Sequence, residues 1–250
     1  MTQAYFVLPA TAEEIQTDYF VSTAAEWNAL AQDTSIDWTN KTIHIQKDIS
    51  FTAKNQAGEI TSYISPVQFG VFSGTLDGHG YTFSDIRMSG SGVNGVSLIT
   101  TLKGTIQNLT LAKTCEFTNT QGSDGAKTGA FAAESVGGTI YKCVSYATYT
   151  ANKGDHLGGF VGTANYGVTI DGCLFAGTVI SEKNGAANAF VGYNNGAGMK
   201  ICNSIAMGTL SVGGETNKKN SAGMIRIHAT MAGRENLIYN SYAIGIPAVG

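Results

Sequence analysis

Charge is scarce in this sequence. Its 15 basic and 18 acidic residues make up 13% of the 250 residues, about half of the ~25% found in average soluble proteins. Solvated helices need many charged residues on their outer faces, and disordered chains need few apolar residues, whereas this chain is 43% apolar. A net charge of −3 also removes the attraction to phosphates on which nucleic-acid binding depends. We expect a folded, strand-rich protein without a nucleic-acid partner.

Long apolar stretches are absent as well. No run of about 18 apolar residues occurs, so we expect no membrane-spanning segment. The opening residues MTQAYFVLPATA lack the basic region and the apolar length of a signal peptide. We interpret Met1 as a start placed on a segment from which a signal was already removed. The expected location is therefore extracellular or at the cell surface.

Motifs of common enzymes and metal sites are also missing. The histidines are remote from one another in sequence and form no HExxH, and neither a GxSxG elbow nor a phosphate-binding GxxxxGKS occurs. The four cysteines form no CxxC pair. We therefore expect no catalytic residues, no metal and no cofactor. Cys143 and Cys173 fall at equivalent places in the repeat described next, and we expect them to be reduced and to fill a core.

A repeat of about 30 residues organises what is present. Three segments align with one another, beginning at Thr128, Leu157 and Ala187, and a less regular fourth segment begins at Ser221. One column of the alignment holds Phe131, Phe160, Phe190 and Met224, and a second holds Ile106, Ile140, Ile170, Ile201 and Ile238. The positions three residues after these isoleucines are Leu109, Cys143, Cys173, Ser204 and Ser241. Seven residues after them come Lys113, Ala147, Gly177, Gly208 and Gly245, which apart from the lysine leave little or no side chain at a turn.

The length of the repeat predicts the fold. A unit of ~30 residues with short β-type runs is too small to bury its own apolar face, so neighbouring units must stack. The ten-residue amphipathic segments that helical repeats need do not occur between residues 38 and 250. We predict an all-β, single-stranded parallel β-helix, right-handed, in which each turn adds ~4.8 Å and like residues lie over like.

The two ends of the predicted β-helix, or coil, differ. Thr23 and Glu26 have the spacing of a capping box, which predicts a short helix whose Trp27 covers the open end of the core. We expect residues 1–37 to form this N-terminal segment and residues 38–250 to form the β-helix repeat domain. The final residues AIGIPAVG supply no such helix, so we expect a further domain or a partner at that end.

Several strings resemble a known family. They are LDGHGYTF at 76–83, GGFVG at 158–162, NAFVG at 188–192, and the IDGC and KICNS that follow the last two. Together they resemble the GLUG-repeat proteins of bacterial cell surfaces, over about residues 20–246. The resemblance implies a surface-exposed parallel β-helix that acts as an adhesin. The LDGxG element also occurs in pectate-lyase-like β-helices, which leaves a polysaccharide lyase or hydrolase as an alternative.

Candidate binding residues follow the isoleucine column. The positions one residue after it, which point outward in a coil, are Gln107, Tyr141, Asp171, Cys202 and Tyr239. Glycan-cleaving enzymes need a set of carboxyl groups that converge on one face, and Asp171 is one acid among five positions. We interpret Asp171 as a solvated carboxylate that contacts a ligand without catalysis. Tyr141 and Tyr239 offer rings on which a sugar can stack.

Much of the remaining charge gathers in loops. Nine charged residues lie in the segments 119–127, 152–156, 182–187 and 213–221, each just before a Gly-x-Phe element or its equivalent. Equivalent positions of a solenoid share a face, so we expect these loops to form one polar edge. This edge either binds a glycan or protein or only keeps the protein in solution. Its candidate ligand-binding residues are Asp124, Asp155, His156 and Glu182.

The sequence as a whole favours a binding module. We predict a non-catalytic, secreted or cell-surface β-solenoid that acts as an adhesin and binds glycan or host or surface protein through its loops and an exposed strand face. Two alternatives remain open, the polysaccharide lyase or hydrolase and a structural spacer within a larger surface protein.

Overall fold

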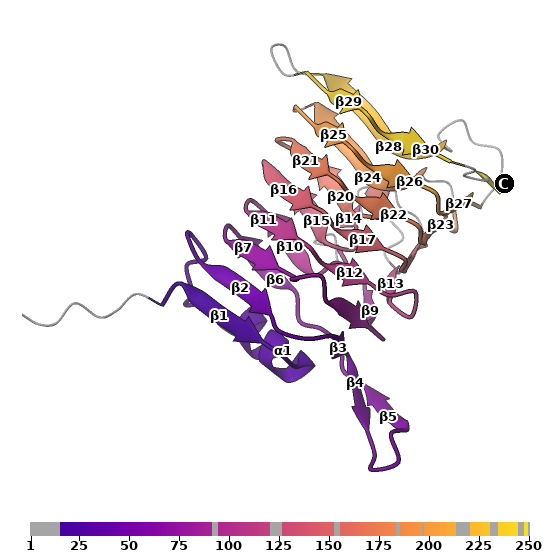
Figure 1. Cartoon of the computed structure of the whole chain (residues 1–250). Coiled ribbons are helices and arrows are strands. Elements are labelled where there is room, and N and C mark those ends of the chain that lie inside the picture. Colours follow the sequence, from indigo (N-terminus) through magenta and orange to yellow (C-terminus); the bar gives the residue numbers. More distant parts are fainter. Residues whose placement is uncertain are drawn as a thin grey trace, which may run out of the picture.

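Strands pair with strands one repeat away rather than with their sequence neighbours, and this pairing builds a parallel β-helix (Figure 1). The computed structural model describes residues 16–91, 95–120, 127–152, 156–183, 186–196, 198–213, 221–230, 235–244 and 248–249. Each turn of the coil passes through four sheets in a fixed order, which we number 1 to 4. The predicted fold class is therefore confirmed.

The four sheets run along the axis of the coil. Sheet 1 contains β1 (Asp18–Val21), β2 (Thr42–Ile45), β7 (Thr75–Asp77), β11 (Thr105–Gln107), β16 (Gly138–Tyr141), β21 (Val168–Asp171), β25 (Lys200–Cys202) and β29 (Leu237–Tyr239). Sheet 2 contains β3 (Ile49–Ser50), β8 (Thr82–Ser84), β12 (Thr110–Leu111), β17 (Val144–Ser145), β22 (Leu174–Phe175), β26 (Ile205–Ala206) and β30 (Tyr242–Ala243). Sheet 3 contains β9 (Arg87–Gly90), β13 (Glu116–Asn119), β18 (Thr148–Ala151), β23 (Thr178–Ser181), β27 (Thr209–Val212) and β31 (Ala248–Val249). Sheet 4 contains β6 (Phe69–Phe72), β10 (Ile99–Leu102), β14 (Lys127–Thr128), β15 (Ala132–Ser135), β19 (His156–Gly158), β20 (Val161–Ala164), β24 (Ala186–Gly196) and β28 (Ser221–Thr230).

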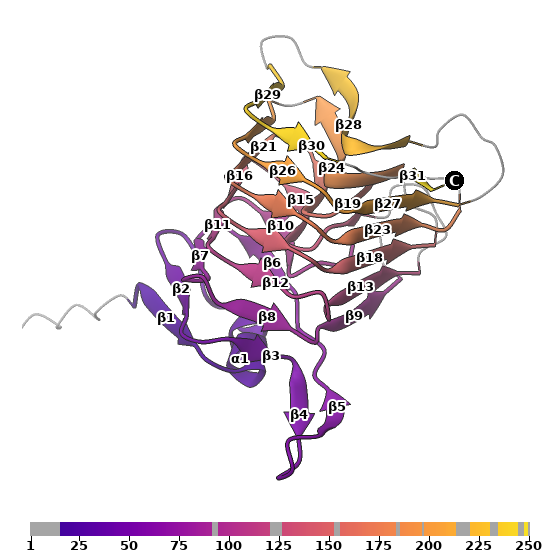
Figure 2. The same ribbon diagram turned by 45° about the vertical axis from the view of Figure 1, so that its right-hand side comes forward.

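The first turn contains a hairpin where later turns have a strand of sheet 3. Strands β4 (Thr52–Lys54) and β5 (Ile60–Tyr63) pair antiparallel and project from the coil (Figure 2). All four residues of β5 are exposed, so the hairpin adds little to the core. The 30-residue repeat gave no indication of this hairpin, because its residues have no counterpart in later turns.

A helix covers the N-terminal end of the core, as the capping box predicted. Helix α1 (Ala24–Gln32) begins after Thr23, whose side chain accepts the N–H of Glu26, while the Glu26 carboxylate accepts the N–H of Thr23. Trp27 is fully buried and packs edge-on against Phe69 and Phe83. Strand β1, also from the N-terminal segment, pairs in parallel with β2 and becomes the outermost strand of sheet 1.

The aligned columns are stacks in the core. Phe131, Phe160 and Phe190 are fully buried, with ring centroids 4.9 and 5.2 Å apart along the stack. The isoleucine column is in direct register through sheet 1 and begins, before Ile106, with Ile43 and Leu76. Its members from Ile43 to Ile201 are at most 1% exposed. Positions about 30 apart therefore do lie directly over one another.

Two further columns explain the turns after sheet 1 and sheet 2. In the cysteine–serine column, the N–H of Cys143 donates to Sγ of Cys173, and the N–H of Cys173 donates to Oγ of Ser204. The Sγ or Oγ atom of each side chain thus accepts a hydrogen bond from a backbone N–H of the preceding turn. In the small-residue column, a Cβ on Gly177 would lie 2.2 Å from the carbonyl oxygen of Ala147, closer than any real contact, so only glycine fits.

All four cysteines are reduced and buried, which agrees with the core-filling role expected for Cys143 and Cys173. Burial raises the pKa of Cys115 to about 11 and that of Cys173 to about 12. Burial also raises the pKa of Cys143 well above its ordinary value.

Replacement of a stacked phenylalanine should destabilise the coil strongly. We expect Phe160→Ala to lower the free energy of unfolding by about 3–5 kcal/mol, because it leaves a cavity between two fixed rings. The control is Tyr146→Ala, since that ring is 42% exposed; its expected effect is below about 1 kcal/mol. Urea unfolding followed by circular dichroism measures both. Equal losses in the two variants would contradict the stacked core.

The thiols should be nearly inert in the folded protein. A pKa raised from 9.0 to about 11 lowers the thiolate fraction of Cys115 about 100-fold at pH 8, and burial further blocks access of a reagent. We expect little reaction with Ellman's reagent in the native state and four reactive thiols after unfolding in guanidinium. A thiol that reacts in the native state as fast as free cysteine would refute this burial.

Candidate functional site

The outer face of sheet 1 carries two in-register columns of side chains, one on each side of the buried isoleucine column. The column before it holds Thr42, Thr75, Thr105, Thr139, Thr169, Lys200 and Leu237. The column after it holds His44, Asp77, Gln107, Tyr141, Asp171, Cys202 and Tyr239. Neighbours in a column are ~4.8 Å apart, the spacing of paired strands. The face is therefore an evenly spaced ladder of hydrogen-bonding and aromatic groups.

Three of the predicted ligand-binding residues share this face. Tyr141, Asp171 and Tyr239 are members of the second column, so three strand steps, about 14 Å, separate the two tyrosines. Tyr141 and Asp171 are half-buried and Tyr239 is exposed. Cys202, between Asp171 and Tyr239, is fully buried although its position was expected to point outward. The structure thus brings these three residues together, while their role in binding stays a prediction.

The threonine column was not recognised in the sequence. Five successive strands place a threonine directly over a threonine, from Thr42 in β2 to Thr169 in β21. The signal was present, because each threonine immediately precedes the buried isoleucine or leucine of its strand. The alignment compared only the apolar columns and the positions that follow them.

The turn after sheet 1 adds a row of amide side chains. Asn240 donates to Oδ1 of Asn203 at 2.6 Å, and Asn203 donates to Oδ1 of Asp171 at 2.8 Å. Asn203 and Asn240 have left-handed backbones with φ of 51° and 48°, a conformation that asparagine tolerates better than most residues. The turn therefore fixes a polar ridge beside the second column.

Lysines lie over both tyrosine rings of the column. Nζ of Lys142 is 4.9 Å from the ring centroid of Tyr141, and Nζ of Lys200 is 5.6 Å from that of Tyr239. A hydrogen bond from Lys200 to Tyr239 raises the pKa of the lysine. Each tyrosine thus forms a cation–π pair at the surface, which a ligand can replace by stacking on the ring.

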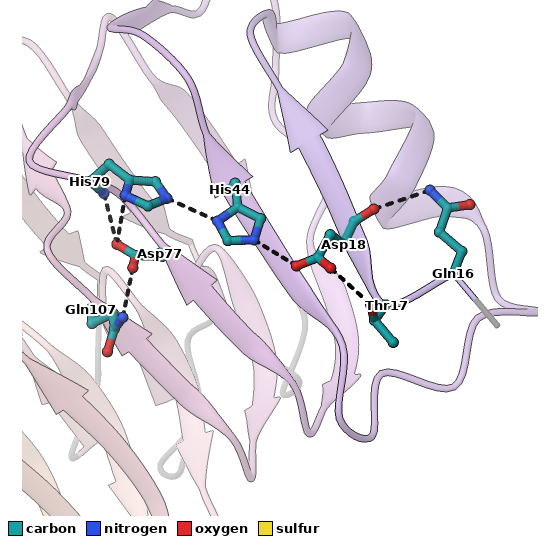
Figure 3. A network of polar contacts seen from close by, with 7 residues as sticks. All are labelled: Gln16, Thr17, Asp18, His44, Asp77, His79 and Gln107. Carbon is teal, nitrogen blue, oxygen red and sulfur yellow. Dashed lines mark hydrogen bonds and ion pairs between the residues drawn. The ribbon is translucent and has the colours of Figure 1, made fainter. Parts of the chain in front are cut away.

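The lower end of the same face holds a chain of polar contacts that sequence reasoning missed (Figure 3). Nε2 of His44 is 2.8 Å from Oδ1 of Asp18, and Nδ1 of His44 is 2.9 Å from Nε2 of His79. Nδ1 of His79 is 3.8 Å from Oδ1 of Asp77. The rings of His44 and His79 are 19° from parallel with centroids 5.2 Å apart, so they meet edge to edge rather than face to face.

The repeat explains why these residues meet. His44 is in register with Asp77 on the neighbouring strand, and His79 follows in a left-handed turn with φ of 48°. The two histidines are 35 positions apart, about one turn of the coil, and had been treated as remote. Extension of the alignment to the first turn would have revealed the pair.

Hydrogen bonds to the two carboxylates favour their charged forms. Burial acts to raise the pKa of Asp77, but the N–H of His79 and the side chains of Asn108 and Gln107 donate to it and lower the pKa overall. The bond from His44 lowers the pKa of Asp18, with a smaller contribution from Thr17. Both groups are therefore carboxylates at neutral pH.

The remaining predicted residues do not join this face. His156 lies on sheet 4, with Nδ1 at 2.7 Å from Oγ1 of Thr163 and its ring stacked on Tyr193. Glu182 is exposed just after β23 of sheet 3. Asp124 and Asp155 lie outside the described residues. Of the nine charged loop residues, the structure describes Lys127, Glu182 and Lys183, so the polar edge stays a prediction.

Within the described ranges, no cluster of three or more His, Cys, Asp or Glu side chains is arranged to hold a metal ion. The helix that the structure describes there is too short to cross a bilayer.

Comparison with known proteins gives limited information. Over 101 residues the chain is 36% identical to halomucin of Haloquadratum walsbyi (strain DSM 16790 / HBSQ001). The aligned part is 40% of this chain and 1% of halomucin, so the chain corresponds to a very small part of that protein. No protein-family model matches the chain. No solved structure matches it.

The hydrogen bonds to Asp77 should make the stability of the folded protein depend on pH in the acidic range. A lowered pKa means that the stabilisation from this carboxylate is complete above its ordinary pKa of 3.8 and is lost as the pH falls through the lowered value. We expect Asp77→Asn to melt below the parent chain at pH 7, and the difference to shrink between about pH 4 and pH 2. Differential scanning fluorimetry measures it. A difference that stays constant over this range would contradict the assignment.

Proposed function

We propose that the chain is a non-catalytic module of a surface protein and that it binds an extended glycan along the outer face of sheet 1. The observation that carries this proposal is the in-register second column, in which Tyr141, Asp171 and Tyr239 lie beside the amide ridge of Asn203 and Asn240. Sugars are bound by flat rings together with planar hydrogen-bonding groups, and this face supplies both.

The even spacing of side chains on the outer face of sheet 1 suits a glycan with a regular repeat. Equivalent groups recur at every strand, so a glycan laid along the coil axis meets similar donors and acceptors at even intervals. The threonine column runs parallel to the tyrosine-bearing column and widens the polar surface. These side chains are held by strands of a stacked sheet, so binding costs little ordering of the protein.

The surface location rests on similarity. The match to halomucin, a protein named as a mucin, supports a cell-surface or extracellular role for this chain. The GLUG-repeat assignment and an adhesin role are part of the same proposal. They are supported by the sequence strings and are compatible with the stacked repeats of the β-helix.

The spacing of carboxylates supports a binding role over a glycosidase role. The carboxylates of the second column are Asp77 and Asp171, three strand steps or about 14 Å apart. Paired carboxyl groups of glycosidases are about 5–9.5 Å apart. The described column therefore offers Asp171 no catalytic partner at a useful distance.

Glycan binding should depend on the two tyrosines of the column. We expect a glycan array to identify ligands, and Tyr141→Ala/Tyr239→Ala to weaken binding about tenfold or more, because each ring contributes about 0.5–1.5 kcal/mol. Isothermal titration calorimetry with the best soluble polysaccharide measures the affinity. The matched control is Tyr146→Ala/Tyr242→Ala, two exposed tyrosines on the side of sheet 2, which should bind as the parent does.

Two outcomes would overturn this proposal. No signal on the array above that of a heat-denatured sample would favour the structural spacer. Sustained turnover of a polysaccharide that Asp171→Asn abolishes would favour the lyase or hydrolase.

A further inference from the structure

The facing nitrogens of His44 and His79 pose a problem of proton placement. Carboxylates at neutral pH only accept hydrogen bonds, so Nε2 of His44, 2.8 Å from Oδ1 of Asp18, must carry a hydrogen. A neutral His44 then has a lone pair on Nδ1, aimed at Nε2 of His79 only 2.9 Å away. His79 with its hydrogen on Nε2 donates to this lone pair, whereas His79 with its hydrogen on Nδ1 leaves lone pairs on both facing nitrogens.

With lone pairs on both facing nitrogens, the two imidazoles can bind one metal ion. Histidines that bind metals almost always donate their second ring N–H to a carboxylate or carbonyl, which fixes the tautomer and aims the free nitrogen at the ion. Asp18 stands in this relation to His44, and Asp77 lies 3.8 Å from the corresponding nitrogen of His79. The chain therefore provides two imidazoles, each with a carboxylate on its far side.

The distance between the facing nitrogens suits two ligands of one ion. Two metal–nitrogen bonds of ~2.0–2.1 Å that meet at an angle between square and tetrahedral place the nitrogens about 2.8–3.4 Å apart. The observed 2.9 Å lies within this range. Because the two nitrogens face each other along one line, each imidazole must turn to point its lone pair at an ion beside that line.

We propose that His44 and His79 bind one divalent transition-metal ion through Nδ1 of His44 and Nε2 of His79, with Asp18 as the hydrogen-bond acceptor behind His44 and Asp77 3.8 Å behind His79. Cu²⁺, Ni²⁺ and Zn²⁺ are the ions that imidazole pairs prefer. The chain supplies two ligands here, in keeping with the lack of any three-residue cluster among the described residues. Water completes the coordination.

The pair is preorganised and open to solvent. His44 is on β2, in register with Phe20, whose ring is 20° from parallel to the imidazole with centroids 5.2 Å apart. His79 is placed by its left-handed turn and by the bond from its own N–H to Asp77. A shallow hollow in front of the pair is lined by Phe20, His44, Ile45, Gln46, His79 and Tyr81. An ion held there can reach bulk water or a ligand in the hollow.

This inference goes beyond the proposed glycan binding and does not depend on it. The tyrosine-bearing part of the column begins at Tyr141, three strand steps from His44. Metal binding can therefore be tested with metal salts alone, and the result does not bear on the glycan proposal.

The test is calorimetric titration of the tag-free chain with CuSO₄, NiCl₂ or ZnCl₂ at pH 7.5. We expect one equivalent to bind, with Cu²⁺ tightest, as the order of stabilities for nitrogen ligands requires. Electron paramagnetic resonance of the Cu²⁺ complex should show hyperfine coupling to two nitrogen nuclei.

Variants assign the site. His44→Ala and His79→Ala should each weaken Cu²⁺ binding at least tenfold, and Asp18→Ala should weaken it about tenfold through loss of the acceptor behind His44. His156→Ala is the matched control, since His156 lies on sheet 4, and it should bind as the parent does. Because His44 and His79 are on the surface of sheet 1, circular dichroism should be unchanged in these variants.

Two results would overturn the proposal. One is a parent chain that binds none of the three ions more tightly than about 1 mM, which would leave the pair as a hydrogen bond between two imidazoles. The other is a His44→Ala/His79→Ala variant that keeps the stoichiometry and affinity of the parent.

Discussion

The parallel pairing of each strand with the strand one turn away is the constraint on which the rest of the structure depends. It places every residue ~4.8 Å from the equivalent residue of the next turn. Each side chain must therefore pack well against the side chain at the same position of the neighbouring turn. The isoleucine column and the phenylalanine stack satisfy this condition inside the coil. Low charge follows from the same constraint, because like charges in one column would repel at that spacing.

The same register gives the outer face its character. Side chains alternate inward and outward along each strand of sheet 1, so a buried isoleucine is flanked by two half-buried columns that share its register. Neither aspartate of the second column has a second carboxylate next to it: Asp171 lies between Tyr141 and Cys202, and Asp77 lies between His44 and Gln107. The turn after each strand then fixes amide side chains beside the carboxylates through left-handed backbones. Binding groups therefore arise at regular intervals, and the one irregular feature, the histidine pair, occurs in the first turns, where the pattern begins.

The sequence predicted the apolar columns and the capping box, and it missed the threonine column and the features that do not repeat. The isoleucine and phenylalanine columns, the glycine turn and the capping box of α1 could be found because each has a local or periodic signal. The β4–β5 hairpin could not, because it replaces a strand once and has no equivalent to align with. The histidine pair escaped because the segments 68–88 and 94–111 carry a different version of the repeat from that of the later turns, and His44 precedes both. The charged loops lie mostly outside the described residues, so their prediction is neither confirmed nor refuted.

The central claim is that distance along the molecule follows the number of turns and not the number of residues. Double electron–electron resonance between two nitroxide labels measures such a distance directly. The native cysteines are buried, so cysteines introduced at the surface are the ones that react with the label. Labels at Thr42→Cys and Thr169→Cys are four strand steps apart in sheet 1, and labels at Thr42→Cys and Leu237→Cys are six. The register predicts separations near 19 and 29 Å, a difference of about 10 Å. Separations that do not increase from the first pair to the second would contradict the stacked coil.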